Sequence, residues 1–274
     1  MFLELLKSAI FGIVEGITEW LPISSTGHMI LLEEIMPLSV SKEFWDMFLV
    51  VIQLGAILAV ILLYFNKLNP FSSKKSPKQK RDTFSLWGKV IIAVIPAAAI
   101  GIPLDDFMNE HFYNFTTVAI TLIIYGIAFI VLENMERQPR IRDFSQMSYK
   151  TALLIGIFQV LSLIPGTSRS GSTIIGATIV GCSRHVATEF SFFLAIPVML
   201  GASLLKVAKF AVSGVGITGM EVLILIVGVI VSFVVSVIAI RFLMGYIRKH
   251  DFKVFGYYRI VLGIIVVIYA VLTA

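Results

Sequence analysis

The sequence is poor in charge and in cysteine, and both shortages narrow the class of protein. Only 14% of its 274 residues are charged, against about 25% in an ordinary soluble chain. The single cysteine, Cys182, excludes an internal disulfide and a cysteine-rich metal site. A basic leader with a small-residue cleavage site is also missing, since Glu4 precedes Lys7, so we expect no cleaved signal peptide. In place of charge the chain holds 58% hydrophobic residues, which predicts an all-α, polytopic membrane protein.

Long apolar runs predict six full transmembrane helices, since a span needs about 20 apolar residues. They lie near residues 44–65, 86–104, 114–133, 186–207, 220–242 and 255–273. Two other regions are apolar but broken. The first has pieces at about 5–21 and 28–36, of which the second is too short to cross a bilayer, and the other broken region covers about 149–181. We therefore expect each broken region to form a re-entrant helix pair.

Lysine and arginine are concentrated in alternate loops, at 66–85, 134–150 and 241–253. The positive-inside rule places these basic loops in the cytoplasm and leaves residue 44 and the C-terminus outside. The first re-entrant pair then enters from the external side. The basic loop at 66–85 is expected to be a topology signal that meets anionic headgroups, without a catalytic role.

The two halves of the chain repeat each other within a single membrane domain, 1–274. Pro22-Ile-Ser-Ser-Thr aligns with Pro165-Gly-Thr-Ser-Arg, and Phe44 aligns with Phe190 at nearly the same separation. Repeat one covers about 1–135 and repeat two about 148–274. Because each half crosses the membrane an odd number of times, the repeat is predicted to be inverted, an arrangement best known from secondary transporters.

The first repeat contains a polar stretch that needs a reason in an apolar chain. Glu15 and Glu19 are four residues apart, so on a helix their carboxylates share one face and repel each other. Either one of them is protonated or a cation lies between them. Pro22 then ends the helix.

The turn that follows is rich in hydroxyls, with Ser24, Ser25 and Thr26 directly before Gly27. These residues can cap a second helix that begins near His28, and free backbone amides at its positive end favour an anion.

The second repeat differs in chemistry from the first. Gln159 stands where Glu15 would be, and Arg169 replaces Thr26. If the two tips face each other, their polar groups are complementary: Glu15, Glu19, Ser25 and His28 from one, and Ser168, Arg169, Ser170, Ser172 and Thr173 from the other. Two helix N-termini, a guanidinium and many hydroxyls suit a phosphate group. The carboxylate pair could hold a hard divalent cation that bridges phosphate oxygens.

Residues 15–28 and 165–171 together resemble the signature pair of the bacterial undecaprenyl-diphosphatase family, the bacitracin-resistance proteins, and the similarity covers essentially the whole chain. The resemblance implies a phosphatase that hydrolyses undecaprenyl diphosphate to undecaprenyl phosphate and inorganic phosphate. Such an enzyme recycles the lipid carrier for peptidoglycan synthesis and confers bacitracin resistance. It would lie in the bacterial inner membrane, with its active site opening toward the extracytoplasmic side, and need a divalent cation, Mg²⁺ or Ca²⁺.

Site roles follow from the same resemblance. It implies metal or acid–base roles for Glu15 and Glu19, catalytic roles for Ser25 and His28, and phosphate binding by Arg169. The nucleophile is left open between Ser25 and His28. We also expect substrate contacts from five hydroxyl side chains, those of Ser24, Thr26, Ser168, Ser170 and Thr173.

Structural roles are the alternatives. Arg169 could pair with Glu19 only for stability, His28 could cap or pack, and the hydroxyls could satisfy backbone groups. Asp46 and Glu189, near span ends, are expected to be interfacial.

Transport is the competing class of function, because inverted repeats with broken helices are typical of transporters that could move the prenyl phosphate across the bilayer. A passive scaffold subunit is a third option. The expected partners are the polyprenyl diphosphate and membrane lipids, without nucleic acid. Gly55-Ala56 and Gly201-Ala202 allow close helix contact, either within one chain or in a homodimer.

Overall fold

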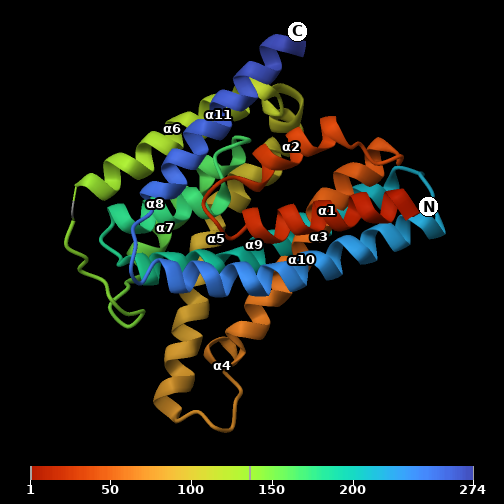
Figure 1. The fold of residues 1–274 in the computed structure, drawn as a ribbon. Helices are drawn as coiled ribbons and strands as arrows, with labels where there is room; N and C mark the ends of the chain where they lie inside the picture. The colour runs from red at the N-terminus through yellow and green to blue at the C-terminus, as the bar shows by residue number, and fades with distance from the viewer. Residues whose placement is uncertain (1, 136, 274) are drawn as a thin grey trace.

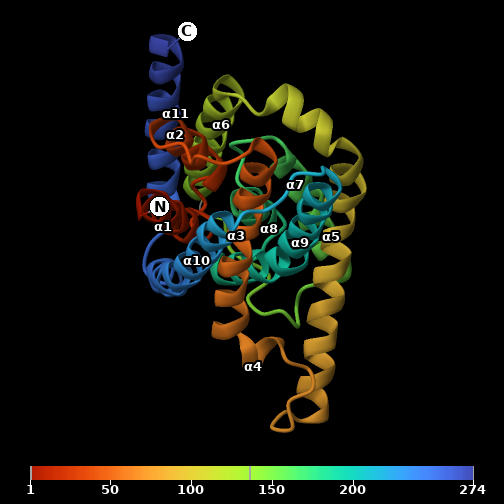
Figure 2. The same cartoon turned by 90° about the vertical axis from the view of Figure 1, so that its right-hand side faces the viewer.

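The computed structural model describes residues 2–135 and 137–273. Within these residues all the regular secondary-structure elements are helices (Figure 1, Figure 2). In chain order the helices are α1 (Phe2–Thr18), α2 (Ser25–Ile35), α3 (Lys42–Leu63), α4 (Phe65–Leu68), α5 (Pro77–Phe112), α6 (Phe115–Asn134), α7 (Tyr149–Val160), the 3₁₀ helix η1 (Leu161–Leu163), α8 (Arg169–Ile179), α9 (Arg184–Val212), α10 (Gly219–Tyr246) and α11 (Lys253–Thr273).

Six of these helices are long and apolar enough to cross a membrane, namely α3, α5, α6, α9, α10 and α11, which confirms the predicted number. The prediction of a continuous loop at 66–85 was wrong. The short helix α4 starts at its edge, and α5 begins inside it, because Ser76 and Gln79 form a capping box around Pro77 at the first helical position. At the other end of the chain α10 continues to Tyr246, so Arg241 lies in a helix and not in a basic loop.

The two broken regions form two pairs of short helices with matching breaks. The first break separates α1 from α2, and the second separates α7 and η1 from α8. Ser24 and Ser168 precede the second helix of each pair with φ angles of 74° and 73°, the only positive values at non-glycine residues in the part of the chain described. Each serine caps the helix that follows, and both of these helices have 11 residues. The two breaks therefore share one backbone conformation.

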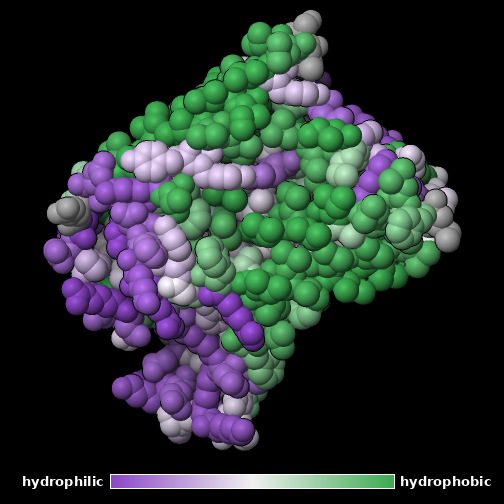
Figure 3. Space-filling view, viewed as in Figure 1, coloured by the Kyte–Doolittle hydropathy of each residue, from purple (hydrophilic) through white to green (hydrophobic). Residues whose placement is uncertain are grey.

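The outer surface separates into apolar and polar regions. Large apolar side chains lie exposed along α6, α10 and α11, among them Ile120, Ile230 and Val261. Figure 3 shows this apolar surface as a broad green area. The larger hydrophilic area lies around α4 and the loops that precede α5 and α7, and a smaller one lies at the upper right of the view. Because hydrocarbon is as apolar as these side chains, the surface is that of a multi-pass membrane protein.

Small residues bring the helices into close contact. A Cβ at Gly12 of α1 would lie 2.7 Å from the carbonyl oxygen of Gly228 of α10, and these helices run side by side (Figure 1). Gly55 of α3 meets α10 as well, with the Val229 oxygen 2.2 Å from such an added atom. Its contact is thus within the chain. A Cβ at Gly201 would meet no atom within 4 Å.

Candidate active site

The end of α1 carries the first predicted acids. Glu19 lies just beyond α1, yet its amide donates to the carbonyl oxygen of Glu15 at 3.0 Å, so the helical path reaches it. After the chain turns back, Ser24 Oγ accepts from the amide of Gly27 at 3.2 Å. This cap starts α2 at Ser25, whose Oγ donates to Glu19 Oε2 at 2.8 Å. The turn thus sets a hydroxyl directly on a carboxylate.

The second break presents a cation in the same way. Gly166 has a φ of +86°, and a Cβ there would lie 2.1 Å from Thr121 Oγ1, so this position requires glycine. Ser168 Oγ then accepts from the amide of Gly171 at 3.0 Å and starts α8. Arg169 is the first residue of that helix.

The two breaks meet at Glu19, as the sequence predicts. Arg169 Nη2 donates to Glu19 Oε1 at 2.7 Å, and Ser170 Oγ donates to the Glu19 carbonyl oxygen at 3.1 Å. The other guanidinium nitrogen, Nη1, donates to the carbonyl oxygen of Ser191 at 2.7 Å. One carboxylate of Glu19 therefore holds Ser25 with one oxygen and Arg169 with the other, in a largely buried position.

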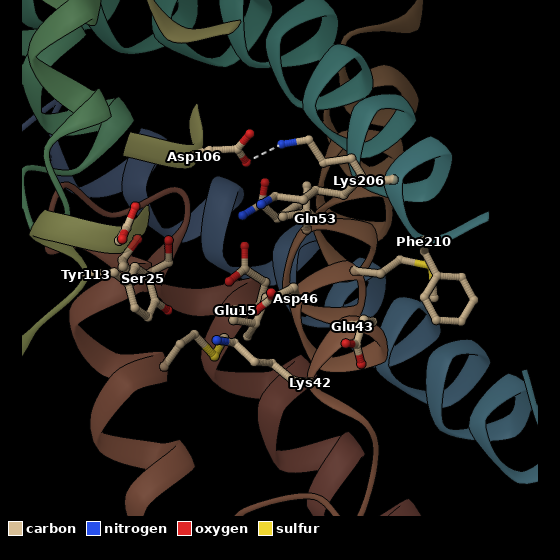
Figure 4. A pocket seen from close by; sticks show the side chains of 17 residues that line it. Glu15, Ser25, Lys42, Glu43, Asp46, Gln53, Asp106, Tyr113, Lys206 and Phe210 are labelled. Carbon is tan, nitrogen blue, oxygen red and sulfur yellow. Dashed lines mark hydrogen bonds and ion pairs between the residues drawn. The ribbon is translucent and has the colours of Figure 1, made fainter. Parts of the chain in front are cut away.

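Glu15 has no salt bridge to a described residue, and its side-chain hydrogen-bond partner is the neighbouring carboxyl group of Glu19. It is 1% exposed, and its Oε1 has no hydrogen bond. Figure 4 shows its carboxyl group pointing toward Gln53 in a cavity. Since Arg169 already pairs with Glu19, Glu15 must carry a proton or lie beside another cation.

A hard divalent cation fits this oxygen, because such ions are commonly held by one or two carboxylates together with substrate phosphates. Across the described residues, no group of three or more His, Cys, Asp or Glu could hold a metal by itself. The predicted pair, Glu15 and Glu19, would therefore have to share the ion with oxygens of the substrate.

The cavity has a volume of about 610 Å³, and its lining includes Glu15, Ser25 and Thr26. Figure 4 shows the side chains of Glu15 and Ser25 among those that surround it. Its remaining walls come from the beginning of α3 and from the ends of α5 and α9. The ionisable side chains of these walls are Lys42, Glu43, Asp46, Asp106, Glu110, Tyr113, Lys206 and Lys209. The cavity therefore lies at the end of α3 and α5 opposite the basic loop between them.

The charged cavity walls were missed from the sequence. Asp46 was expected to be merely interfacial, but it lines the cavity. Lys209 links α9 to α5 through Asp105 Oδ2 at 2.8 Å and Asp106 Oδ1 at 2.7 Å. The sequence does show these residues as charges near the ends of spans. Only the packing of α3, α5 and α9, which are distant in sequence, brings them together as one wall.

The other predicted hydroxyls make contacts within the protein. The Ser24 and Ser168 hydroxyls cap helices, and Ser168 Oγ also lies 3.1 Å from Ser170 Oγ. Thr173 Oγ1 and Ser191 Oγ are 2.7 Å apart. Thr26 lines the cavity. Substrate binding by these five residues stays a prediction.

His28 lies on the side of α2 that faces α11. Its Nδ1 is 2.7 Å from the carbonyl oxygen of Ser24, and its Nε2 is 2.7 Å from the Tyr258 hydroxyl. Like Glu19 and Arg169, it is not among the residues that line the cavity, but Glu19 contacts Ser25 directly and His28 does not. The structure therefore separates the two candidate nucleophiles, with Ser25 in the cavity and His28 outside it.

Arg259 was overlooked in the sequence although a basic residue within the last apolar run is unusual. Its side chain is fully buried and donates to the carbonyl oxygens of Gly166 at 2.9 Å, Thr167 at 3.0 Å and Pro22 at 3.2 Å. One guanidinium of α11 thus ties the two breaks together. Carbonyl oxygens left by the breaks satisfy its hydrogen-bonding groups, apart from Nε.

At the opposite ends of the helices an ion pair joins α4 to α9. Glu189, expected to be interfacial, is paired with Lys67 at 2.5 Å. The ammonium group of Lys67 also lies over the rings of Phe144 and Phe193. This part of the basic loop therefore packs against α9 and does not only mark topology.

Comparison with known proteins identifies the family of the chain. The chain is 62% identical over 269 residues to an undecaprenyl-diphosphatase of Acetivibrio thermocellus, covering 97% of this chain and 98% of that one. It is 58% identical over 271 residues to an undecaprenyl-diphosphatase of Enterococcus faecalis, covering 98% of each. With an undecaprenyl-diphosphatase of Limosilactobacillus fermentum it shares 60% identity over 99% of both chains. The profile of the bacitracin resistance protein BacA family matches residues 8–265. The chain therefore belongs to the bacitracin resistance protein BacA family.

Proposed function

We propose that this protein is a membrane phosphatase that hydrolyses undecaprenyl diphosphate to undecaprenyl phosphate and inorganic phosphate. It would recycle the lipid carrier for peptidoglycan synthesis and so confer resistance to bacitracin. The observation that carries the proposal is the carboxylate of Glu19, which binds Ser25 through one oxygen and Arg169 through the other. Family membership and the names of the relatives support the substrate.

Ser25 is the proposed nucleophile. Its Oγ attacks the terminal phosphorus, its proton passes to Glu19 Oε2, and the bond between that phosphorus and the bridging oxygen breaks. Undecaprenyl phosphate leaves with the bridging oxygen. Glu19 gives the serine proton to the departing phosphate and is a base again. It then takes a proton from the water that attacks the phosphoserine and passes it to Oγ as the P–Oγ bond breaks, which regenerates Ser25 and releases phosphate.

Arg169 neutralises charge on the terminal phosphoryl group. Its guanidinium is anchored on Ser191 through Nη1, so a rotation about this contact would move Nη2 from Glu19 to a phosphate oxygen. This exchange also releases Glu19 to accept the serine proton. A divalent cation on Glu15, with Glu19 and phosphate oxygens as further ligands, would supply additional charge neutralisation when bound.

The architecture that we propose is a single membrane domain of two inverted repeats, about 1–135 and 148–274, each with one re-entrant helix pair. The matching backbone at Ser24 and Ser168 supports the repeat. The protein would lie in the bacterial inner membrane with its cavity opening to the extracytoplasmic side. The position of the cavity, at the ends of α3 and α5 remote from the basic loop, supports that orientation. A homodimer stays a prediction.

Phosphate release by the purified protein in detergent tests the function. We expect release from undecaprenyl diphosphate, its loss with a chelator, and its recovery when Mg²⁺ or Ca²⁺ is returned. Ser25→Ala should abolish release and the trapped phosphoserine, while Ser183→Ala, which removes the cap of α9 outside the site, should keep both. A phosphoryl group trapped on His28 would contradict the assignment of Ser25.

Transport of the prenyl phosphate is the second candidate. It is favoured by the matching helix breaks at Ser24 and Ser168, because paired broken helices are typical of secondary transporters. A transporter alone would release no phosphate in detergent but would move labelled prenyl phosphate between the leaflets of vesicles.

A further inference from the structure

Both ring nitrogens of His28 are engaged, and the partners define the tautomer. A carbonyl oxygen can only accept, so Nδ1, 2.7 Å from the oxygen of Ser24, carries the proton. The neutral ring then accepts at Nε2 from the hydroxyl of Tyr258, which lies 2.7 Å away on α11. The two rings are nearly parallel, at 8°. The two ring nitrogens of His28 are therefore both hydrogen-bonded, Nδ1 to Ser24 and Nε2 to Tyr258.

The contact with Ser24 acts on a strained residue. Ser24 has a φ of 74°, which an L side chain rarely adopts and which neighbouring contacts must maintain. The next residue is Ser25, whose Oγ must face Glu19 Oε2. A change at Ser24 would therefore move the hydroxyl that meets the carboxylate.

Consecutive residues of α11 hold this turn at two points. Arg259 donates directly to the carbonyl oxygen of Pro22 at 3.2 Å, and Tyr258 reaches Ser24 through His28. At the second break Arg259 alone holds two successive carbonyl oxygens, those of Gly166 and Thr167. The first break has one direct bond from the guanidinium, and the His28–Tyr258 pair supplies the other.

We propose that Tyr258 and His28 are positioning residues that brace the Ser24 turn and so aim Ser25 at Glu19, and that the imidazole takes no part in proton transfer. This inference rests on the proposed phosphatase activity for its kinetic readout. It separates His28 from the reaction and adds a residue of α11, Tyr258, to the determinants of the rate.

Replacement of His28 by two different side chains tests the proposal. In His28→Asn the amide nitrogen takes the place of Nδ1, so the bond to Ser24 remains while Tyr258 and any acid–base chemistry are lost. We expect kcat to fall by about fivefold with KM unchanged. In His28→Ala the turn loses its brace, and kcat should fall by about 100-fold. Equal loss in both variants, or near-normal turnover of the alanine variant, overturns the proposal.

Tyr258→Phe should match His28→Asn and add nothing when the two are combined, since both remove the same contact. Tyr257→Phe is the matched control on the same helix, where the side chain is 56% exposed, and it should leave kcat unchanged. Additive losses in the double variant would overturn the link between Tyr258 and His28.

Hydrogen exchange provides a readout that does not depend on activity. Backbone amides of the first break, residues 19–25, should exchange faster in Tyr258→Phe than in Tyr257→Phe. Exchange of the amides of the second break, residues 164–168, should stay unchanged. Unaltered exchange in the first break would refute the brace. Absence of phosphate release by the wild-type protein would instead refute the proposed function, with the exchange result still deciding the brace.

Discussion

The two helix breaks have the same backbone and opposite chemistry. Ser24 and Ser168 share a positive φ and cap the amide three residues ahead. Next to these caps, however, the first break places Ser25 on the carboxylate of Glu19, and the second places Arg169. Neither break alone has both an acid and a fixed cation. The comparison indicates that the backbone of each break serves to position side chains, and that the reaction depends on which side chains are positioned there.

The largest expected effect comes from removing the charge at the meeting point. In Glu19→Gln the amide can still accept from Ser25, but Arg169 loses its counter-ion and no base remains, so phosphate release should fall by about 1,000-fold. The matched control is Glu133→Gln, which opens the ion pair between Glu133 and Arg184 away from the cavity. Its turnover should stay near the wild-type rate, and a normal rate for Glu19→Gln would break the comparison.

The cation of the second break is the next test. Arg169→Lys keeps the charge but cannot bind Ser191 and Glu19 at the same time in a fixed fork, so we expect a loss of about 100-fold with the fold intact. Arg184→Lys alters the ion pair with Glu133 in the same manner and should leave release unchanged. Wild-type turnover by folded Arg169→Lys would remove Arg169 from the chemistry.

A comparison of two glycines, Gly166 and Gly214, tests what the backbone of the second break requires. Gly166→Ala places a Cβ 2.1 Å from Thr121 Oγ1 in a left-handed residue, and should destabilise the protein by about 2 kcal/mol or more. Gly214 also has a positive φ, +77°, but nothing lies within 4 Å, so Gly214→Ala should cost about 1 kcal/mol. Thermal unfolding in detergent measures both. Equal shifts would mean that conformation alone, without the close contact, makes glycine necessary at 166.

The smallest expected effects are the losses of stability when either capping serine is replaced, and they should be similar in size. Ser24→Ala and Ser168→Ala each remove one cap bond, which is worth about 1 kcal/mol. Ser168→Ala also removes the contact with Ser170 Oγ, but that hydroxyl keeps its bond to the Glu19 carbonyl oxygen. We therefore expect similar decreases in the midpoint of thermal unfolding. A much larger decrease for Ser24→Ala would show that the two capping serines do not contribute equally to the stability of their breaks.

Much of the fold could be predicted because its signals are local. Six apolar runs, the interruptions at Pro22 and Pro165 and the serines that follow them are all visible within short windows of the sequence. The helix α1 nevertheless ends at Thr18, before the expected residue 21. The start of α5 was missed, although its capping box at Ser76 and Gln79 is local too, because a run of lysines around it was interpreted as loop.

The site was predictable only in part. The polar residues on each break stood out against an apolar background, and Arg169 was expected to face the acids. The sharing of Glu19 between Ser25 and Arg169, and the turning of His28 toward Tyr258, depend on contacts between residues far apart in the chain.

By itself the sequence determined the class of protein, the number of spans and the position of both breaks, because hydrophobic length and helix caps act over a few turns. The tertiary structure decided which oxygen of Glu19 meets which partner, that Arg259 holds both breaks, and that charges from α3, α5 and α9 line one cavity. Those outcomes depend on how helices distant in sequence pack, since hydrogen bonds of about 3 Å are decided by the final placement of each side chain.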